Sequence, residues 1–204
     1  MSDFDLLLSY LCGRRSIREF SDQQLSRGCL QQLIEAATWA PSAGNRQDWM
    51  FSVVESSDAK QALVATVRGK WEGILAANQD LGFAQELAEY ASTFADFARA
   101  PVVIAVSAAA PNAMHRHLLG EAARATVGSF ASAAMAAQNL MLAAHALGLG
   151  ACCMTGALAA AAELSQLLGL GRRREVVCLI ALGHPVSQPA APQRKPYHEV
   201  VRYH

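Results

Sequence analysis

Three arginines and a serine lie within five consecutive residues, Arg14-Arg15-Ser16-Ile17-Arg18. Guanidinium groups stay charged at any physiological pH and match phosphate oxygens with pairs of parallel hydrogen bonds. A second basic pair, Arg194-Lys195, lies near the other end of the chain. The two clusters predict a phosphate-binding site if the fold brings both ends of the chain to one ligand. Otherwise each cluster is a solvated patch of surface.

A segment rich in turn-forming residues and amides lies between the two basic clusters. It reads Ala40-Pro41-Ser42-Ala43-Gly44-Asn45-Arg46-Gln47. Side-chain amides both donate and accept hydrogen bonds, so this segment suits the polar edge of a ring. Together with the basic clusters, it indicates a ligand that carries both a phosphate and a polar ring.

The composition indicates a single domain over residues 1–204 with a substantial apolar core. The formal net charge is zero, which argues against nucleic acid as a partner, since binding a phosphate backbone normally requires a basic excess. No apolar run reaches the ~20 residues that span a bilayer, and Asp3 and Asp5 stand where a secretory signal would be basic. The five cysteines show no CxxC spacing. We therefore expect a cytoplasmic protein without a membrane partner.

Hydrophobic periodicity predicts an α-rich pattern of helices and strands. Helices are expected at 3–12, 26–39, 58–68 and 126–147, with mostly helical structure over 71–99. Strands are expected at 50–55, 102–106, 151–154 and 176–182. The helix over 126–147 is apolar nearly all round, which predicts a central, buried position. Prolines predict an extended arm from about residue 186.

Several other motifs do not predict a site. The run Gly148-Leu149-Gly150 lacks the third glycine of a dinucleotide fingerprint and follows a helix instead of preceding one. His115 and His117 have no third ligand at metal-binding spacing, so no metal is expected. The pair Cys152-Cys153 fits buried strand thiols, and residues 172–174 fit a solvated turn.

An ordered set of sequence blocks resembles the FMN-dependent nitroreductase family. The first blocks are the arginine-rich run that ends at Phe20 and the segment 40–49. They are followed in the family's order by 100–104, 137–144, 146–150 with Thr155-Gly156, 182–185 and 194–196. Residues 56–98 and 107–125 match poorly.

This resemblance implies an α+β sandwich with a central, mainly antiparallel sheet flanked by helices. The family fold is an intertwined homodimer with two FMN sites, both at the dimer interface. We expect the C-terminal arm, about residues 186–204, to cross to the partner subunit.

The resemblance also implies roles for individual residues. Arg14, Ser16 and Arg194 would bind the FMN phosphate, with Arg15 beside it, and Thr155 and Gly156 would offer backbone groups to the flavin ring. Arg18 would stabilise negative charge on the pyrimidine end of the ring, and no side-chain nucleophile or general base is needed. Pro41, Ser42, Ala43 and Asn45 would come from the partner subunit, and Gln47 would also bind the cofactor.

The implied activity is hydride transfer from NADH or NADPH to FMN, then reduction of a nitroaromatic, quinone or related small acceptor by a ping-pong mechanism. Two alternatives are a flavin-fragmenting enzyme that makes dimethylbenzimidazole and a non-catalytic flavin-binding protein. The sequence departs from the family pattern at Asp48, where a proline is common, at Thr155, where some members carry glutamate, and at Pro192. The acceptor channel, expected at about 71–98 and 108–126, shows no readable motif.

Overall fold

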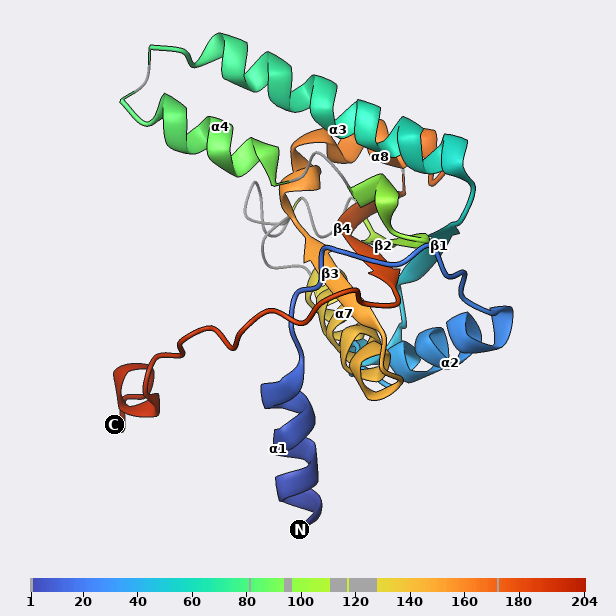
Figure 1. Cartoon of the computed structure of the whole chain (residues 1–204), viewed down its shortest axis with the longest axis vertical. Helices are drawn as coiled ribbons and strands as arrows, with labels where there is room; N and C mark the ends of the chain where they lie inside the picture. Colours follow the sequence, from blue (N-terminus) through green and yellow to red (C-terminus); the bar gives the residue numbers. More distant parts are fainter. Residues whose placement is uncertain (1, 81, 94–96, 111–116, 118–127, 172) are drawn as a thin grey trace.

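A four-stranded antiparallel sheet forms the centre of the computed structural model, which describes residues 2–80, 82–93, 97–110, 117, 128–171 and 173–204 (Figure 1). The strands stand in the order β1-β2-β4-β3, and each neighbouring pair is antiparallel. Their bounds are β1 (Met50–Val54), β2 (Val102–Ala109), β3 (Gly150–Met154) and β4 (Arg174–Gly183). The expected α+β class with an antiparallel sheet is confirmed.

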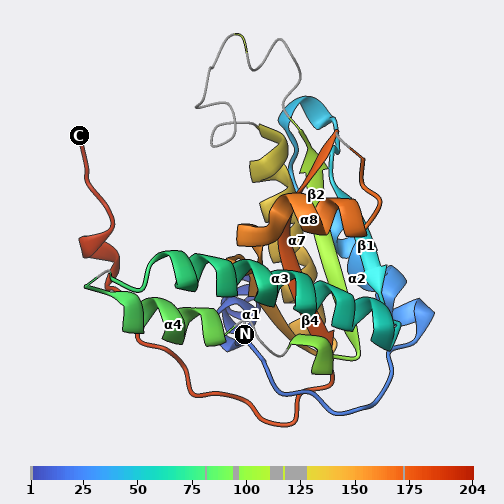
Figure 2. The same cartoon turned by 90° about the horizontal axis from the view of Figure 1, so that it is seen from above.

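Helices cover both faces of the sheet, as Figures 1 and 2 show. On one face, α2 (Arg27–Thr38) and α7 (Gly128–Ala146) pack Leu33 and Leu140 against Ile104 and Ile180 of the central strands. The other face is covered by α3 (Ser57–Ala77), η4 (Gly156–Ala160) and α8 (Ala161–Leu167). Because both faces are buried, β2 and β4 are almost continuously apolar instead of alternating.

Two segments at the ends of the chain leave apolar side chains exposed. Helix α1 (Asp3–Gly13) begins with a capping box between Ser2 and Asp5 but buries none of its residues. The arm over 186–204 is exposed throughout, with one short turn, η5 (Tyr197–Glu199), and extends away from the sheet in Figure 1. Exposed apolar surface of this extent normally marks an interface with another molecule. The large exposed side chains here are Phe4, Leu6, Leu7, Leu8, Tyr10 and Leu11 on α1, and Val186, Tyr197, Val200, Val201 and Tyr203 on the arm.

The sequence located most elements but placed several wrongly. Helix α3 continues to Ala77, nine residues past the expected end at 68, and α8 was not expected at all. The expected helical stretch over 71–99 divides into the end of α3, α4 (Ala84–Ser92) and η2 (Phe97–Arg99). The expected central, buried position of α7 is confirmed for the face that carries Leu140, whereas Phe130 and Met135 on α7 are exposed. His115, Arg172 and most of 108–126 lie outside the described residues.

No helix in the described ranges has both the length and the apolar character needed to cross a membrane.

A buried lysine joins the helical layer to the sheet. Lys60 of α3 is 8% exposed, and its Nζ donates to the carbonyl oxygens of Ala100 (2.7 Å) and Pro101 (3.0 Å). Burial lowers the pKa of Lys60, because a charged ammonium loses its hydration there. The two carbonyl acceptors offset that cost. They lie where η2 leads into β2, so Lys60 fixes the start of a central strand.

We expect Lys60→Met to lower the free energy of unfolding by about 2 kcal/mol, because it leaves two buried carbonyls without their donor. Denaturant unfolding measures this change. The matched control is Lys70→Met on the same helix, where Nζ of Lys70 pairs with Glu163 at 2.8 Å on the surface. The control should be nearly as stable as the wild type. Equal stability of both variants would contradict a structural role for Lys60.

Candidate functional site

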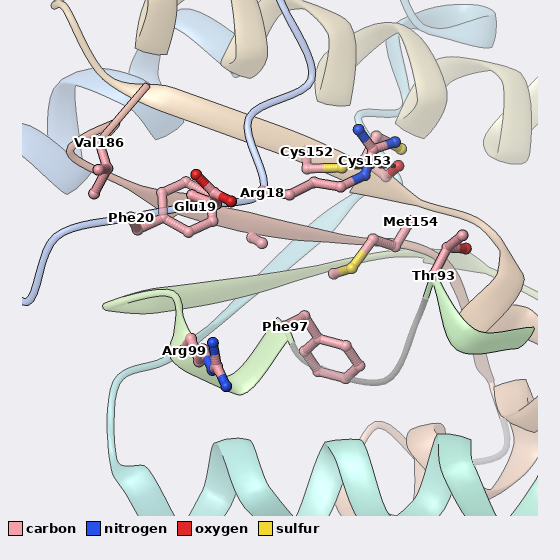
Figure 3. A pocket seen from close by; sticks show the side chains of 11 residues that line it. Arg18, Glu19, Phe20, Thr93, Phe97, Arg99, Cys152, Cys153, Met154 and Val186 are labelled. Carbon is pink, nitrogen blue, oxygen red and sulfur yellow. Dashed lines mark hydrogen bonds between the residues drawn. The ribbon is translucent and has the colours of Figure 1, made fainter. Parts of the chain in front are cut away.

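A cavity of about 460 Å³ opens beside the edge strand β3 (Figure 3). Its walls come from the segment after α1, from β3, and from the segment between α4 and β2. Apolar side chains form much of the wall, and Arg18 and Arg99 add positive charge. The lining residues are Arg18, Glu19, Phe20, Thr93, Phe97, Arg99, Cys152, Cys153, Met154, Ala181 and Val186.

The segment that carries the arginines is held along the edge of the sheet. Ser16 forms a parallel bridge with Ala151, and the backbone N–H of Ile17 donates to the carbonyl of Ala151 at 3.1 Å. Ile17 is buried against Gly150, where an added Cβ would lie 2.6 Å from its Cγ2. Glycine is therefore required at this position for the two backbones to approach. These contacts bring Arg18 to the mouth of the cavity.

The two ends of the chain do meet at this edge. The N–H of Ser21 donates to the carbonyl of His184 (2.9 Å), and the N–H of Val186 donates to that of Glu19 (3.2 Å). Farther along, Gln188 Nε2 donates to the carbonyl of Gly13 at 3.3 Å. The start of the arm is thus fixed against the arginine-rich segment. Arg194 lies beyond this point and is exposed, so its contribution to the same site stays a prediction.

A smaller hollow of about 150 Å³ adjoins the arginine-rich segment, with Arg14, Arg15 and His145 in its wall. Arg15 Nη1 donates to the carbonyls of Cys12 (2.6 Å) and Arg14 (2.9 Å). Its Nε is buried and has no hydrogen-bond partner among the described residues. An unpaired guanidinium N–H in a hollow beside a second arginine suits an anion such as a phosphate.

The loop over 41–48 lies at the opposite end of α7. The N–H of Ala43 donates to Ser132 Oγ at 3.2 Å, whereas the hollow at Arg14 contains His145. Ser132 and His145 lie thirteen residues apart on α7, which corresponds to about 20 Å along the helix axis. One chain therefore does not bring its own Pro41, Ser42, Ala43, Asn45 and Gln47 to its own arginine-rich segment.

Asp48 organises this loop. Its carboxylate accepts hydrogen bonds from Arg46 Nε (2.9 Å) and Ser129 Oγ (2.9 Å), and its carbonyl accepts one from Arg174 Nη1 (2.9 Å). The expectation of a solvated turn is therefore wrong for Arg174, which belongs to β4. The loop also holds Asn45 and Gln47 in the left-handed region, at φ 53° and 51°. These contacts offset the strain of that conformation.

Thr155 and Gly156 follow β3 directly, at the point where η4 begins. Thr155 is exposed and does not cap η4 with its side chain, while Gly156 is buried. The carbonyl of Gly156 accepts a hydrogen bond from Trp71 Nε1 at 3.0 Å. The pair thus continues the strand whose residues 152–154 line the cavity, so its backbone lies near the end of the cavity wall.

The family model described as Nitroreductase family matches residues 11–184 of this sequence. The chain belongs to the nitroreductase family. Both the arginine-rich segment and the turn at Thr155 fall within the matched range. The expectation of a nitroreductase-family enzyme is confirmed.

Sequence relatives agree with this assignment to the nitroreductase family. The NADH dehydrogenase of Thermus thermophilus is 29% identical over 92% of this chain and 91% of its own length. The NADPH-flavin oxidoreductase of Vibrio harveyi is 27% identical over 94% of this chain and 70% of its own. A shorter match, 45% identical, covers 25% of this chain and 29% of an NADH dehydrogenase/NAD(P)H nitroreductase homologue from Archaeoglobus fulgidus.

Solved structures of nitroreductase-like proteins share the fold. A Desulfovibrio desulfuricans protein described as a nitroreductase in complex with FMN is 27% identical, with a TM-score of 0.71 over 97% of this chain and 96% of its own. A BluB-like flavoprotein from Clostridium difficile 630 has a TM-score of 0.82 at 24% identity, over 97% and 98% of the two chains. At that identity the second similarity shows the fold alone.

The cavity is lined by residues that the sequence did not indicate. Phe97 and Met154 project into the cavity in Figure 3, and Trp71 contacts the turn after β3. Cys153 was expected to be buried, and this is wrong, because it is exposed and lines the cavity. The placement of Cys152 is confirmed as buried. Residues 152–154 directly precede Thr155, which the sequence had indicated as a site residue. This adjacency is the sequence signal that could have identified them as part of the cavity wall.

The three cysteines near the cavity differ in acidity. The pKa of Cys153 is lowered, because the thiol of Cys178 donates a hydrogen bond to its sulfur and the charge of Arg14 lies nearby. The same hydrogen bond and burial raise the pKa of Cys178. Burial raises the pKa of Cys152. Thiolate, the reactive form, is therefore concentrated at Cys153.

We expect iodoacetamide to alkylate Cys153 ahead of Cys152 and Cys178. Because its pKa is lowered, Cys153 forms thiolate at a lower pH than an ordinary exposed thiol. The midpoint of its labelling rate against pH should therefore be shifted to lower pH. Peptide mass spectrometry after brief labelling at several pH values measures this order. In the Cys153→Ser variant, the rapid alkylation of the β3 peptide should be lost. Labelling of Cys152 first would contradict the assignment.

Proposed function

We propose that this chain is an FMN-dependent oxidoreductase that takes hydride from NADH or NADPH and reduces a nitroaromatic, quinone or related small acceptor. The observation that carries the proposal is the position of the arginine-rich segment, which lies along β3 beside a cavity wide enough for a flat ring. Its membership of the nitroreductase family and its similarity to a structure in complex with FMN support the same activity.

The residues at this edge fit FMN. Arg14, Arg15 and Ser16 would hold the phosphate, and the unpaired Nε of Arg15 is a donor of the required kind. Phe97 and Met154 offer apolar contacts to a ring, and the backbone of Thr155 and Gly156 would face its edge. When bound, FMN accepts a hydride, gains negative charge at its pyrimidine end and passes two electrons on.

Arg18 would stabilise that negative charge. Its side chain lines the cavity and is exposed, and its Nη1 makes one long hydrogen bond, 3.4 Å, to the carbonyl of Ser16. Within the described part of the chain it forms no ion pair; its neighbour Glu19 accepts a hydrogen bond from Ser187 instead. Its charge is therefore available to a ligand, and preorganised charge of this kind is often a large catalytic contribution.

We propose that two copies assemble to complete the site. The apolar side chains exposed on α1, α7 and the arm would then be buried between the copies. The loop over 41–48 lies about 20 Å along α7 from the hollow at Arg14. A second copy would supply this loop to the site, and the arm that carries Arg194 would pack on the partner.

The proposed activity is tested by titrating the purified protein with FMN and then following NADH and NADPH oxidation with a panel of nitroaromatics and quinones. We expect turnover well above that of free FMN, with the parallel double-reciprocal lines of a ping-pong mechanism. Oxidation no faster than with free FMN would identify a flavin-binding protein without activity. Formation of dimethylbenzimidazole from reduced FMN in air would support the flavin-fragmenting alternative.

We expect Arg18→Met to lower the midpoint potential of bound FMN by ~30 mV, which corresponds to about 1.4 kcal/mol for two electrons. Reduction by NAD(P)H should slow about tenfold, because a comparable stabilisation is lost from the transition state. Binding of oxidised FMN should weaken only slightly. The control is Arg27→Met. Arg27 is an exposed arginine of α2 that pairs with Glu55. An unchanged potential with a lower melting temperature would show that Arg18 is structural.

A further inference from the structure

The turn that follows β3 packs against α3, and one side chain of that helix is hydrogen-bonded to it. Trp71 of α3 is half-buried, and its indole Nε1 donates to the carbonyl of Gly156 at 3.0 Å. Helices α3 and α4 run side by side, with α8 on the other side of α3 (Figure 2). A helix remote in sequence, 85 residues earlier, therefore holds the backbone of this turn.

The same indole contacts the segment that forms the opposite wall of the cavity. The ring of Trp71 meets that of Tyr90 of α4 edge to face, with 5.6 Å between centroids and 76° between planes. Such geometry is favourable for aromatic pairs. Helix α4 ends at Ser92, and the next residue, Thr93, lines the cavity. Trp71 thus connects Gly156, two residues beyond the lining residue Met154, with α4, which leads into the lining residue Thr93.

Gly156 begins η4, and the Trp71 indole adds a hydrogen bond to its carbonyl from outside the turn. Glycine has the widest backbone freedom of any residue, and Thr155 does not cap the start of η4 with its side chain. A carbonyl engaged by an indole N–H cannot rotate toward the cavity without losing a hydrogen bond in a buried position. The donor at Trp71 therefore adds to the bond from Leu158 N–H to the Thr155 carbonyl (2.9 Å) in fixing the Thr155–Gly156 backbone.

We propose that Trp71 is a positioning residue that fixes the backbone of Gly156 against the flavin edge and so tunes the potential of the bound cofactor. The inference rests on the proposed function, because it assumes FMN in the cavity. Trp71 itself does not line the cavity; it acts through the Gly156 carbonyl. Its effect should be separate from that of Tyr90, whose ring meets that of Trp71 edge to face.

Trp71→Phe tests this inference, because it keeps an aromatic ring for Tyr90 and removes only the N–H donor. In the FMN-loaded protein we expect the preference for reduced over oxidised FMN to fall about threefold to tenfold, the effect of one hydrogen bond. A tenfold change equals a fall of ~30 mV in the midpoint potential. Turnover should fall by a similar factor, with the KM for the acceptor nearly unchanged.

Two further variants make the test specific. Trp39→Phe removes a tryptophan N–H from a surface position that is 83% exposed, and should leave the potential unchanged. Tyr90→Leu keeps the indole donor and disturbs the cavity wall, so it should change the KM for the acceptor and not the potential. A Trp71→Phe holoenzyme with a lower melting temperature but an unchanged potential and turnover would overturn the inference alone. A wild-type protein that binds no FMN would overturn the proposed function and the inference with it.

Discussion

The pairing of residues 16–21 with the sheet is the interaction on which the rest of the site depends. The N–H of Ile17 bonds to the carbonyl of Ala151, and its side chain packs on Gly150, which has no Cβ to obstruct it. Backbone pairing at this edge sets where Arg14 and Arg18 lie relative to β3. It also fixes the start of the arm through Ser21 and Val186. One short stretch of backbone thus positions both the arginine-rich segment and the start of the arm.

The two layers of helices have different roles: one layer buries a continuous core, and the other lies on the side of the cavity. Helices α2 and α7 pack on the face formed by Ile104 and Ile180 and bury a continuous core there. Helix α3, η4 and α8 cover the opposite face, and the cavity opens on that side beside β3. Lys60 and Trp71 extend from α3 to the backbone before β2 and after β3, next to the lining residues Arg99 and Met154. The layer that encloses the cavity is therefore held to the sheet by polar contacts as well as by apolar packing.

The sequence predicted what local pattern and family resemblance encode. The β-branched run after Pro101 identified a buried strand, and the family blocks identified the arginine-rich segment and the Thr155 turn. It missed α8, because the short Ala-rich stretch over 161–167 carries no clear periodicity. It misplaced Cys153, because alternation along a strand does not say which positions a neighbouring element leaves uncovered. The contacts of Trp71 and Asp48 join segments far apart in sequence, and local pattern cannot predict such contacts.

The segment that carries the arginines also shields the outer edge of β3. An edge strand with free N–H and C=O groups can pair with the same strand of another molecule, which is a route to aggregation. Ser16 and Ile17 occupy part of that edge at Ala151. Solubility and ligand recognition therefore share one stretch of chain. Damage to it would expose a strand edge in addition to removing charged groups, so a protein altered here should be difficult to keep in solution.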